Sequence, residues 1–112
     1  DVPNLVSTFG YINASWTLKA DLTAEYSCRL LNHMAATGMR QCTPRLPAQD
    51  QDMAGEDWID GFSSGYIQRK LHLLPKQGPA SPWRNTQNYM LDRKIIGEGP
   101  IEDGVLEFRN PA

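Results

Sequence analysis

Five residues in the second half of the chain have the spacing of a hydrolase nucleophile. Residues 61–65 read Gly-Phe-Ser-Ser-Gly, and a serine flanked by glycines in this way is the nucleophile of α/β-hydrolases when a central strand leads into it. The preceding Glu-Asp-Trp-Ile-Asp is a poor central strand, and no Asp or Glu lies between Ser63 and His72, the next histidine. The motif therefore predicts a glycine-flanked loop in which Ser63 or Ser64 caps a helix.

Two cysteines and two histidines could in principle hold a zinc ion. They are Cys28, His33, Cys42 and His72. Cys28 and His33 would lie about 140° apart around a helix, and no pair has the C-x-x-C or H-x3-H spacing of a zinc site. We expect no metal site, two reduced thiols, a buried Cys28 and a solvated His33 near a helix end, although a Cys28–Cys42 disulfide stays open on spacing.

Three further patterns fail on physical grounds. Residues 97–102 begin like a dinucleotide fingerprint, but Glu102 would set a carboxylate against pyrophosphate, so we predict a turn. Asn13 begins a formal glycosylation acceptor, with no secretory signal in front of it. The tryptophans could stack on nucleic-acid bases, but the acidic charge balance favours packing in a core or between domains. These tryptophans are Trp16, Trp58 and Trp83.

The composition restricts the function classes. The chain has 112 residues, 40% of them hydrophobic, and a net charge of -2, which fits one small globular domain and disfavours nucleic acid as a partner. No apolar run approaches the roughly 20 residues of a membrane-spanning helix. The first residues, Asp-Val-Pro-Asn, contain neither an initiator Met nor a signal peptide. We therefore expect a fragment of a longer, cytoplasmic protein.

The first third of the chain predicts a strand followed by a long helix. Residues 4–12 are rich in β-branched and aromatic side chains and predict a buried strand. Apolar residues then recur every four positions and predict an amphipathic helix over residues 16–37, which Gly38 ends. This apolar stripe consists of Leu18, Leu22, Tyr26, Leu30 and Met34. Three residues could cap the start of the helix: Asn13, Ser15 and Thr17.

The remaining residues predict short elements separated by Pro and Gly. Residues 43–55 predict an exposed loop, and residues 63–73 predict a short helix that ends before Pro75. Residues 84–96 predict another helix, and the alternation over residues 105–108 predicts a closing strand. Such short apolar groups are typical of a tail that wraps a neighbouring domain.

The run over residues 10–22 carries a specific resemblance. It reads Gly-Tyr-Ile-Asn-Ala-Ser-Trp-Thr-Leu-Lys-Ala-Asp-Leu and resembles the last flavin-facing loop and helix start of FAD-dependent monooxygenases of the Baeyer–Villiger type. The resemblance covers about residues 4–108 and is weakest over residues 41–60. It continues through short blocks in the same order at residues 28–32, 65–66, 74–78, 82–84 and 87–89.

The resemblance implies an α+β fragment of a flavoprotein with two dinucleotide-binding domains. Residues 1–38 would be the C-terminal strand and helix of the FAD-binding domain, and residues 39–112 a C-terminal wrapping extension. FAD and NADPH would be the cofactors of the parent protein, which would insert one oxygen atom from O2 into a ketone or onto sulfur. The implied partners are the rest of the monooxygenase chain and that small molecule, with a homo-oligomer left open.

The resemblance also implies which residues face the cofactor. A helix start carries free N–H groups and roughly +0.5 charge, while reduced flavin is negative along its pyrimidine edge. Backbone N–H groups of Trp16, Thr17 and Leu18 could stabilise that charge, and Asn13 and Trp16 could line the flavin or substrate side. A plain capped helix start is the alternative for this loop.

The sequence departs from the family pattern in having no G-x-G-x-x-G motif, no F-x-G-x-x-x-H motif and no matching catalytic arginine. The family's catalytic residues therefore carry over to no position here, and we expect the chain alone to be inactive, with weak or no FAD binding. The alternative from another class is a non-catalytic assembly module, a dimer that buries the apolar stripe.

Overall fold

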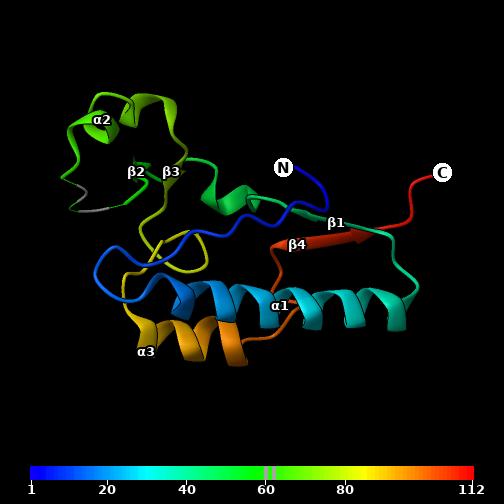
Figure 1. Cartoon of the computed structure of the whole chain (residues 1–112). Helices are drawn as coiled ribbons and strands as arrows, with labels where there is room; N and C mark the ends of the chain where they lie inside the picture. The colour runs from blue at the N-terminus through cyan, green and yellow to red at the C-terminus, as the bar shows by residue number, and fades with distance from the viewer. Residues whose placement is uncertain (60, 62) are drawn as a thin grey trace.

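The long helix α1 (Trp16–Thr37) is the centre of the structure, a computed structural model that describes residues 1–59, 61 and 63–112. Figure 1 shows α3 beside α1 on one side and two small sheets on the other. The arrangement is a small α+β fold with one long helix and short strands, as the sequence predicted.

Both ends of α1 lie where the sequence placed them. Gly38 adopts the left-handed conformation with φ 70°, and the N–H of Met39 donates to the carbonyl oxygen of Met34 at 2.9 Å. A glycine at this position ends a helix without a steric penalty, because it has no Cβ. Ser15 is the N-cap residue, and its side chain makes no capping hydrogen bond.

The strand predicted over residues 4–12 is not formed. The segment runs across the molecule in extended but irregular backbone, and Asn4 ties its beginning to Cys42 through hydrogen bonds of 2.9 Å in both directions. A strand needs a neighbour with which to form a ladder; Asn4 bonds to Cys42 of β1, but no strand in the described residues forms a ladder with this segment. The prediction was wrong because side-chain type alone does not supply that partner.

Two small antiparallel sheets hold the rest of the chain. β1 (Gln41–Pro44) pairs with β4 (Leu106–Arg109), so the predicted closing strand is confirmed with a shift of one residue. β1 also corrects the predicted loop, whose first two residues, Thr43 and Pro44, belong to this strand. The second sheet pairs β2 (Glu56–Asp57) with β3 (Lys76–Gln77), and η1 (Ala48–Asp50) is one 3-10 turn between β1 and β2.

The two predicted tail helices are shorter than expected. The first is split into α2 (Gly65–Gln68) and the 3-10 turn η2 (Leu71–Leu73), because neither piece buries a residue that would stabilise a longer helix. The second begins only at α3 (Tyr89–Asp92), where the side chain of Asn88 accepts a hydrogen bond from the Leu91 N–H, and continues as the π-helical segment η3 (Arg93–Glu98).

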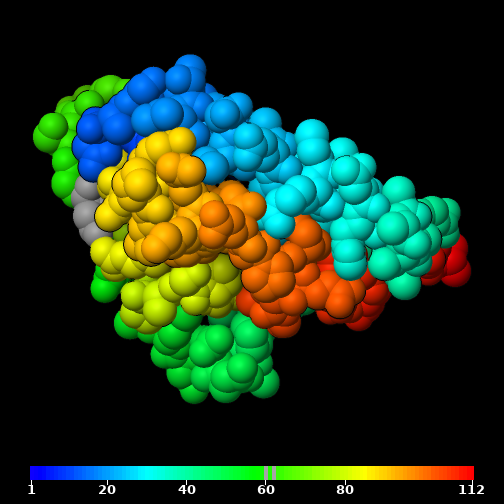
Figure 2. Space-filling model, turned by 90° about the horizontal axis from the view of Figure 1, so that it is seen from below, coloured from blue at the N-terminus to red at the C-terminus, as the bar shows by residue number. Residues whose placement is uncertain are grey.

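The first half of helix α1 packs against α3 and η3 (Figure 2). Leu22 is buried there, and the other members of the stripe are half-buried. The guanidinium of Arg29 reinforces this contact by donating to the carbonyl oxygens of Ile96 at 2.6 Å and Gly99 at 3.0 Å. Figure 2, seen from below, shows residues 80–100 lying directly against the first half of α1. The stripe that a dimer was expected to bury is therefore partly covered by the chain itself.

The cysteines and His33 differ from expectation. Both thiols are free, but Cys28 is exposed rather than buried, since it lies about 200° around the helix from Tyr26 and Leu30 of the stripe. His33 is half-buried, with Nε2 3.1 Å from Glu102 Oε1. No helix in the described part of the chain is long and apolar enough to span a membrane.

Candidate functional site at the start of the long helix

The loop that leads into α1 is held by the tail of the chain. The N–H of Ile12 donates to Oε1 of Gln87 at 3.0 Å, and Nδ2 of Asn13 donates to the backbone carbonyl of Gln87 at 2.9 Å. Asn13 was predicted to line the flavin or substrate side. Its side-chain amide nitrogen anchors the loop to residue 87 and the residue as a whole remains exposed, so its place beside a flavin or substrate stays a prediction.

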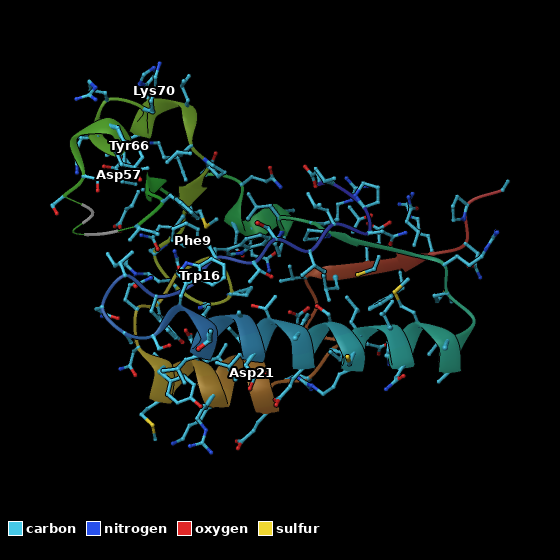
Figure 3. The ribbon with its side chains drawn as sticks, in the orientation of Figure 1. Phe9, Trp16, Asp21, Asp57, Tyr66 and Lys70 are labelled. Atoms are coloured by element: carbon cyan, nitrogen blue, oxygen red, sulfur yellow. The ribbon has the colours of Figure 1, made fainter. Side chains whose placement is uncertain are left out.

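Trp16 lies against the backbone of Gly10. A Cβ added to Gly10 would come within 2.1 Å of Trp16 Cγ, so the contact is available only to glycine. The Phe9 ring meets Trp16 edge-on at 6.1 Å and Trp58 at 4.5 Å between centroids, and Figure 3 shows Phe9 and Trp16 together above the first turn. Trp16 is 48% exposed, so part of the indole is free to meet another surface.

The first turn of α1 presents backbone donors. The Leu18 N–H donates to the Ser15 carbonyl at 3.2 Å, whereas the N–H groups of Trp16 and Thr17 have no acceptor among the described residues. The Ser15 and Thr17 hydroxyls bond to each other at 2.9 Å instead of capping the helix. None of the predicted caps is therefore formed, and the first turn contains no acidic residue. This helix start can accept an electron-rich or anionic group.

A buried carboxylate lies under the same turn. Asp92 Oδ2 accepts from the Tyr11 hydroxyl at 2.6 Å and from Lys19 Nζ at 2.7 Å, and Oδ1 accepts from the Thr86 hydroxyl at 2.5 Å. Asp92 is 2% exposed, and Lys19 also lies 5.3 Å above the Tyr11 ring centre. A carboxylate in this position is tolerable because both of its oxygens accept hydrogen bonds and the Lys19 ammonium balances its charge.

A cleft of about 750 Å³ opens beside this network. Its lining combines the polar groups Lys19, Thr86 and Asp92 with apolar surface from Trp58, Trp83 and Ile96. Within the described residues, no three His, Cys, Asp or Glu side chains come together in a way that could hold a metal ion. Asp60 and Phe62, which adjoin or belong to the G-x-S-x-G motif, lie outside the described residues.

Sequence reasoning missed Asp92, Thr86 and Gln87. A signal for Asp92 was present, because it lies one helical turn after Tyr89 and one turn before Ile96, on the apolar side of the predicted helix. A carboxylate in such a stripe indicates a buried partner. The partners themselves, Tyr11 and Lys19, are too distant in sequence to be inferred from spacing.

Removing the Tyr11 hydroxyl is expected to reduce the decrease in the free energy of unfolding that occurs as the pH rises above about 10. The pKa of Tyr11 lies well above its usual value, because burial disfavours the phenolate and because the Asp92 carboxylate accepts its hydrogen bond and repels its charge. The unfolded chain releases this proton from about pH 10 while the folded chain keeps it, so the stabilisation is complete below pH 10 and is lost as the pH rises toward the folded pKa.

The measurement is the free energy of unfolding between pH 8 and pH 11, where ~1.4 kcal/mol per pH unit is the steepest slope one group can give. Tyr11→Phe should lose less stability above pH 10 than the original chain, and the exposed Tyr66→Phe should follow the original. Burial also raises the pKa of Tyr26, so a residual slope remains in all three. Identical slopes for the chain and Tyr11→Phe would contradict the prediction.

The comparisons with known proteins bear on the chain as a whole and not on this helix start alone. Over nearly its whole length, the chain is homologous to FAD-containing monooxygenases. It is 48% identical over 109 residues to the Acinetobacter baylyi protein named "Probable FAD-binding monooxygenase AlmA". This alignment covers 96% of the present chain and 21% of the relative. It is 46% identical over 112 residues to the FAD-containing monooxygenase EthA of Mycobacterium tuberculosis. That alignment covers 99% of the present chain and 22% of the relative.

The chain thus spans about a fifth of the length of these curated relatives. No family model matches the sequence, and no solved structure matches it.

Proposed function

We propose that this chain is the C-terminal segment of an FAD- and NADPH-dependent monooxygenase that adds one oxygen atom from O2 to a ketone or to sulfur. In this proposal, residues 1–38 complete the FAD-binding domain and residues 39–112 form an extension that wraps it. The similarity to FAD-containing monooxygenases supports the class, and the uncapped start of α1 is the observation that supports a cofactor-facing role.

The residues at this helix start fit a flavin. Trp16 and Thr17 offer backbone donors without an acceptor in the described residues, and the first turn brings no acidic side chain that would repel a negative group. The chain from Ile12 to Thr17 is exposed, so a ring system can approach it. When bound, FAD would supply the redox chemistry, taking a hydride from NADPH and activating O2.

The part that this chain plays is to bind and orient. The N–H groups of Trp16 and Thr17 would donate to the electron-rich edge of the ring, with the positive end of α1 behind them. The Leu18 N–H would be the weakest of the three donors, because it already donates to the Ser15 carbonyl. Trp16 would cover the ring edge and exclude water, while Asn13 would keep the loop on residue 87. NADPH and substrate would be bound by the rest of the protein, so the isolated segment would be inactive.

Replacing Ser15 by aspartate tests this role, because it should stabilise a plain helix start but weaken FAD binding at a flavin-facing one. At an ordinary exposed helix start, Asp caps the free N–H groups and stabilises by about 0.5–2 kcal/mol. At a flavin-facing start, the carboxylate takes the donors that the flavin needs and repels its negative edge. In the whole protein, we expect Ser15→Asp to raise the Kd for FAD about tenfold or more and to lower the flavin reduction potential.

Ser15→Ala is the matched control, because the Ser15 side chain makes no capping bond that could be lost. Its Kd for FAD should stay within about twofold of the original. An aspartate variant that is more stable and binds FAD unchanged would support the plain helix start. NADPH consumption by the whole protein, with ketones and thioethers as substrates, tests the activity. A whole protein that binds no FAD would overturn the proposal and favour the assembly module.

A further inference from the structure

Residues 86–92 contact the loop that leads into α1 and the first turns of that helix. Asp92 accepts from Tyr11 and Lys19, which lie on either side of the candidate site, and Gln87 accepts from Ile12 and Asn13 within it. The loop and first turn are thus held by residues more than 70 positions away in the sequence. Besides these bonds, Trp16 lies against Gly10 and Phe9, while the side chains from Ile12 to Thr17 remain largely exposed.

The burial of Asp92 needs an explanation beyond packing. The Lys76–Asp57 pair at 2.9 Å shows the usual arrangement, with both side chains about half exposed, whereas the Asp92 and Lys19 side chains are 3% and 15% exposed. A buried ion pair often stabilises no better than apolar residues of the same size, and in some proteins such a pair serves to fix one geometry. The geometry fixed here is that of Tyr11 and Lys19, and therefore of the turn between them.

Building on the proposed function, we propose that Asp92 is a positioning residue of the cofactor site. Its carboxylate, through Tyr11 and Lys19, holds the loop and the first turn of α1 so that the Trp16 and Thr17 N–H groups face the flavin. The extension would then have a defined role, since it would set the geometry of a site that belongs to another part of the protein.

The test compares three variants of the whole protein. Asp92→Asn removes the charge and keeps the shape of the side chain. Gln87→Ala removes one loop contact at a half-buried position and tests the same idea without threatening the fold. Asp57→Asn is the matched control, since it makes the same change of charge at an exposed ion pair on β2.

Three readouts separate positioning from general stability. Amide hydrogen exchange at residues 12–19 should become about tenfold faster in Asp92→Asn and about threefold faster in Gln87→Ala, with Asp57→Asn within twofold of the original. The Kd for FAD should rise about tenfold in Asp92→Asn, and the flavin absorption band should shift, again without change in Asp57→Asn.

If Asp92→Asn lowers the melting temperature but leaves the exchange of residues 12–19, the flavin band and the Kd within twofold, the positioning role is overturned. Hydrogen exchange does not need the cofactor. A whole protein that binds no FAD therefore refutes the proposed function, while unchanged exchange at the loop refutes the holding role of Asp92 in its own right.

Discussion

Replacing Gly10 by alanine is expected to displace Trp16 and to destabilise the start of α1 by about 1–3 kcal/mol. The new methyl would lie 2.1 Å from Trp16 Cγ and 2.4 Å from Cδ1 and Cδ2, far inside the roughly 3.5–4.0 Å at which carbon atoms attract. The indole cannot move aside easily, because it is attached to the first residue of the helix and packs edge-on against Phe9. In the proposed site, this displacement would also lower FAD affinity.

Tryptophan fluorescence and denaturant unfolding of the chain measure this effect. Gly97→Ala is the matched control, because the methyl there would meet Leu22 Cδ2 at 3.8 Å, an ordinary contact. The control should lose no stability, and gain up to about 1 kcal/mol because alanine has less backbone freedom to lose, while keeping its fluorescence spectrum. If Gly10→Ala behaves like the control, Trp16 does not lie on the Gly10 backbone in solution.

Local signals explain which elements the sequence could predict. The α1 helix was placed correctly because its apolar stripe is long and because Gly38 ends it through its own backbone conformation. The closing strand was also found, although its partner β1 was hidden in a segment that reads as a loop. Short elements with little burial, such as α2 and η2, were predicted too long, because their extent depends on packing that the sequence does not describe.

The strand predicted over residues 4–12 was wrong for a related reason. Its side chains suit a pleated surface, but the Ile12 N–H bonds to Gln87 rather than to a neighbouring strand. The residue types show that a segment is suited to a strand, whereas the strand forms only if another segment supplies a pairing partner.

The candidate site was predicted only in part. The run over residues 10–22 was singled out by resemblance, and the uncapped turn at Trp16 and Thr17 agrees with the free N–H groups expected there. That these residues and Leu18 contact FAD stays a prediction. The support from Asp92 and Gln87 was missed, because a contact across some 75 to 81 positions leaves no periodic signal in one sequence.

Truncating Leu22 to alanine is expected to cost about 2–5 kcal/mol of the free energy of unfolding. Leu22 is 7% exposed and is the buried member of the α1 stripe, facing η3 near Gly97. Among the residues that the structure describes, few other side chains are as deeply buried, so the cavity left there would not be compensated by a large core. Urea unfolding of the 112-residue chain, followed by the helical signal in circular dichroism, measures the loss.

Leu31→Ala on the same helix removes the same atoms from a side chain that is 64% exposed, and should cost less than about 0.5 kcal/mol. Equal losses at both positions would show that α1 does not present the Leu22 face to η3. A loss at Leu31 that grows with protein concentration would mean that a second copy covers this side chain, and would favour the assembly module. A loss that appears only in the whole protein would instead mean that the rest of the proposed monooxygenase packs on α1, because burial converts an exposed leucine into one whose truncation leaves a cavity.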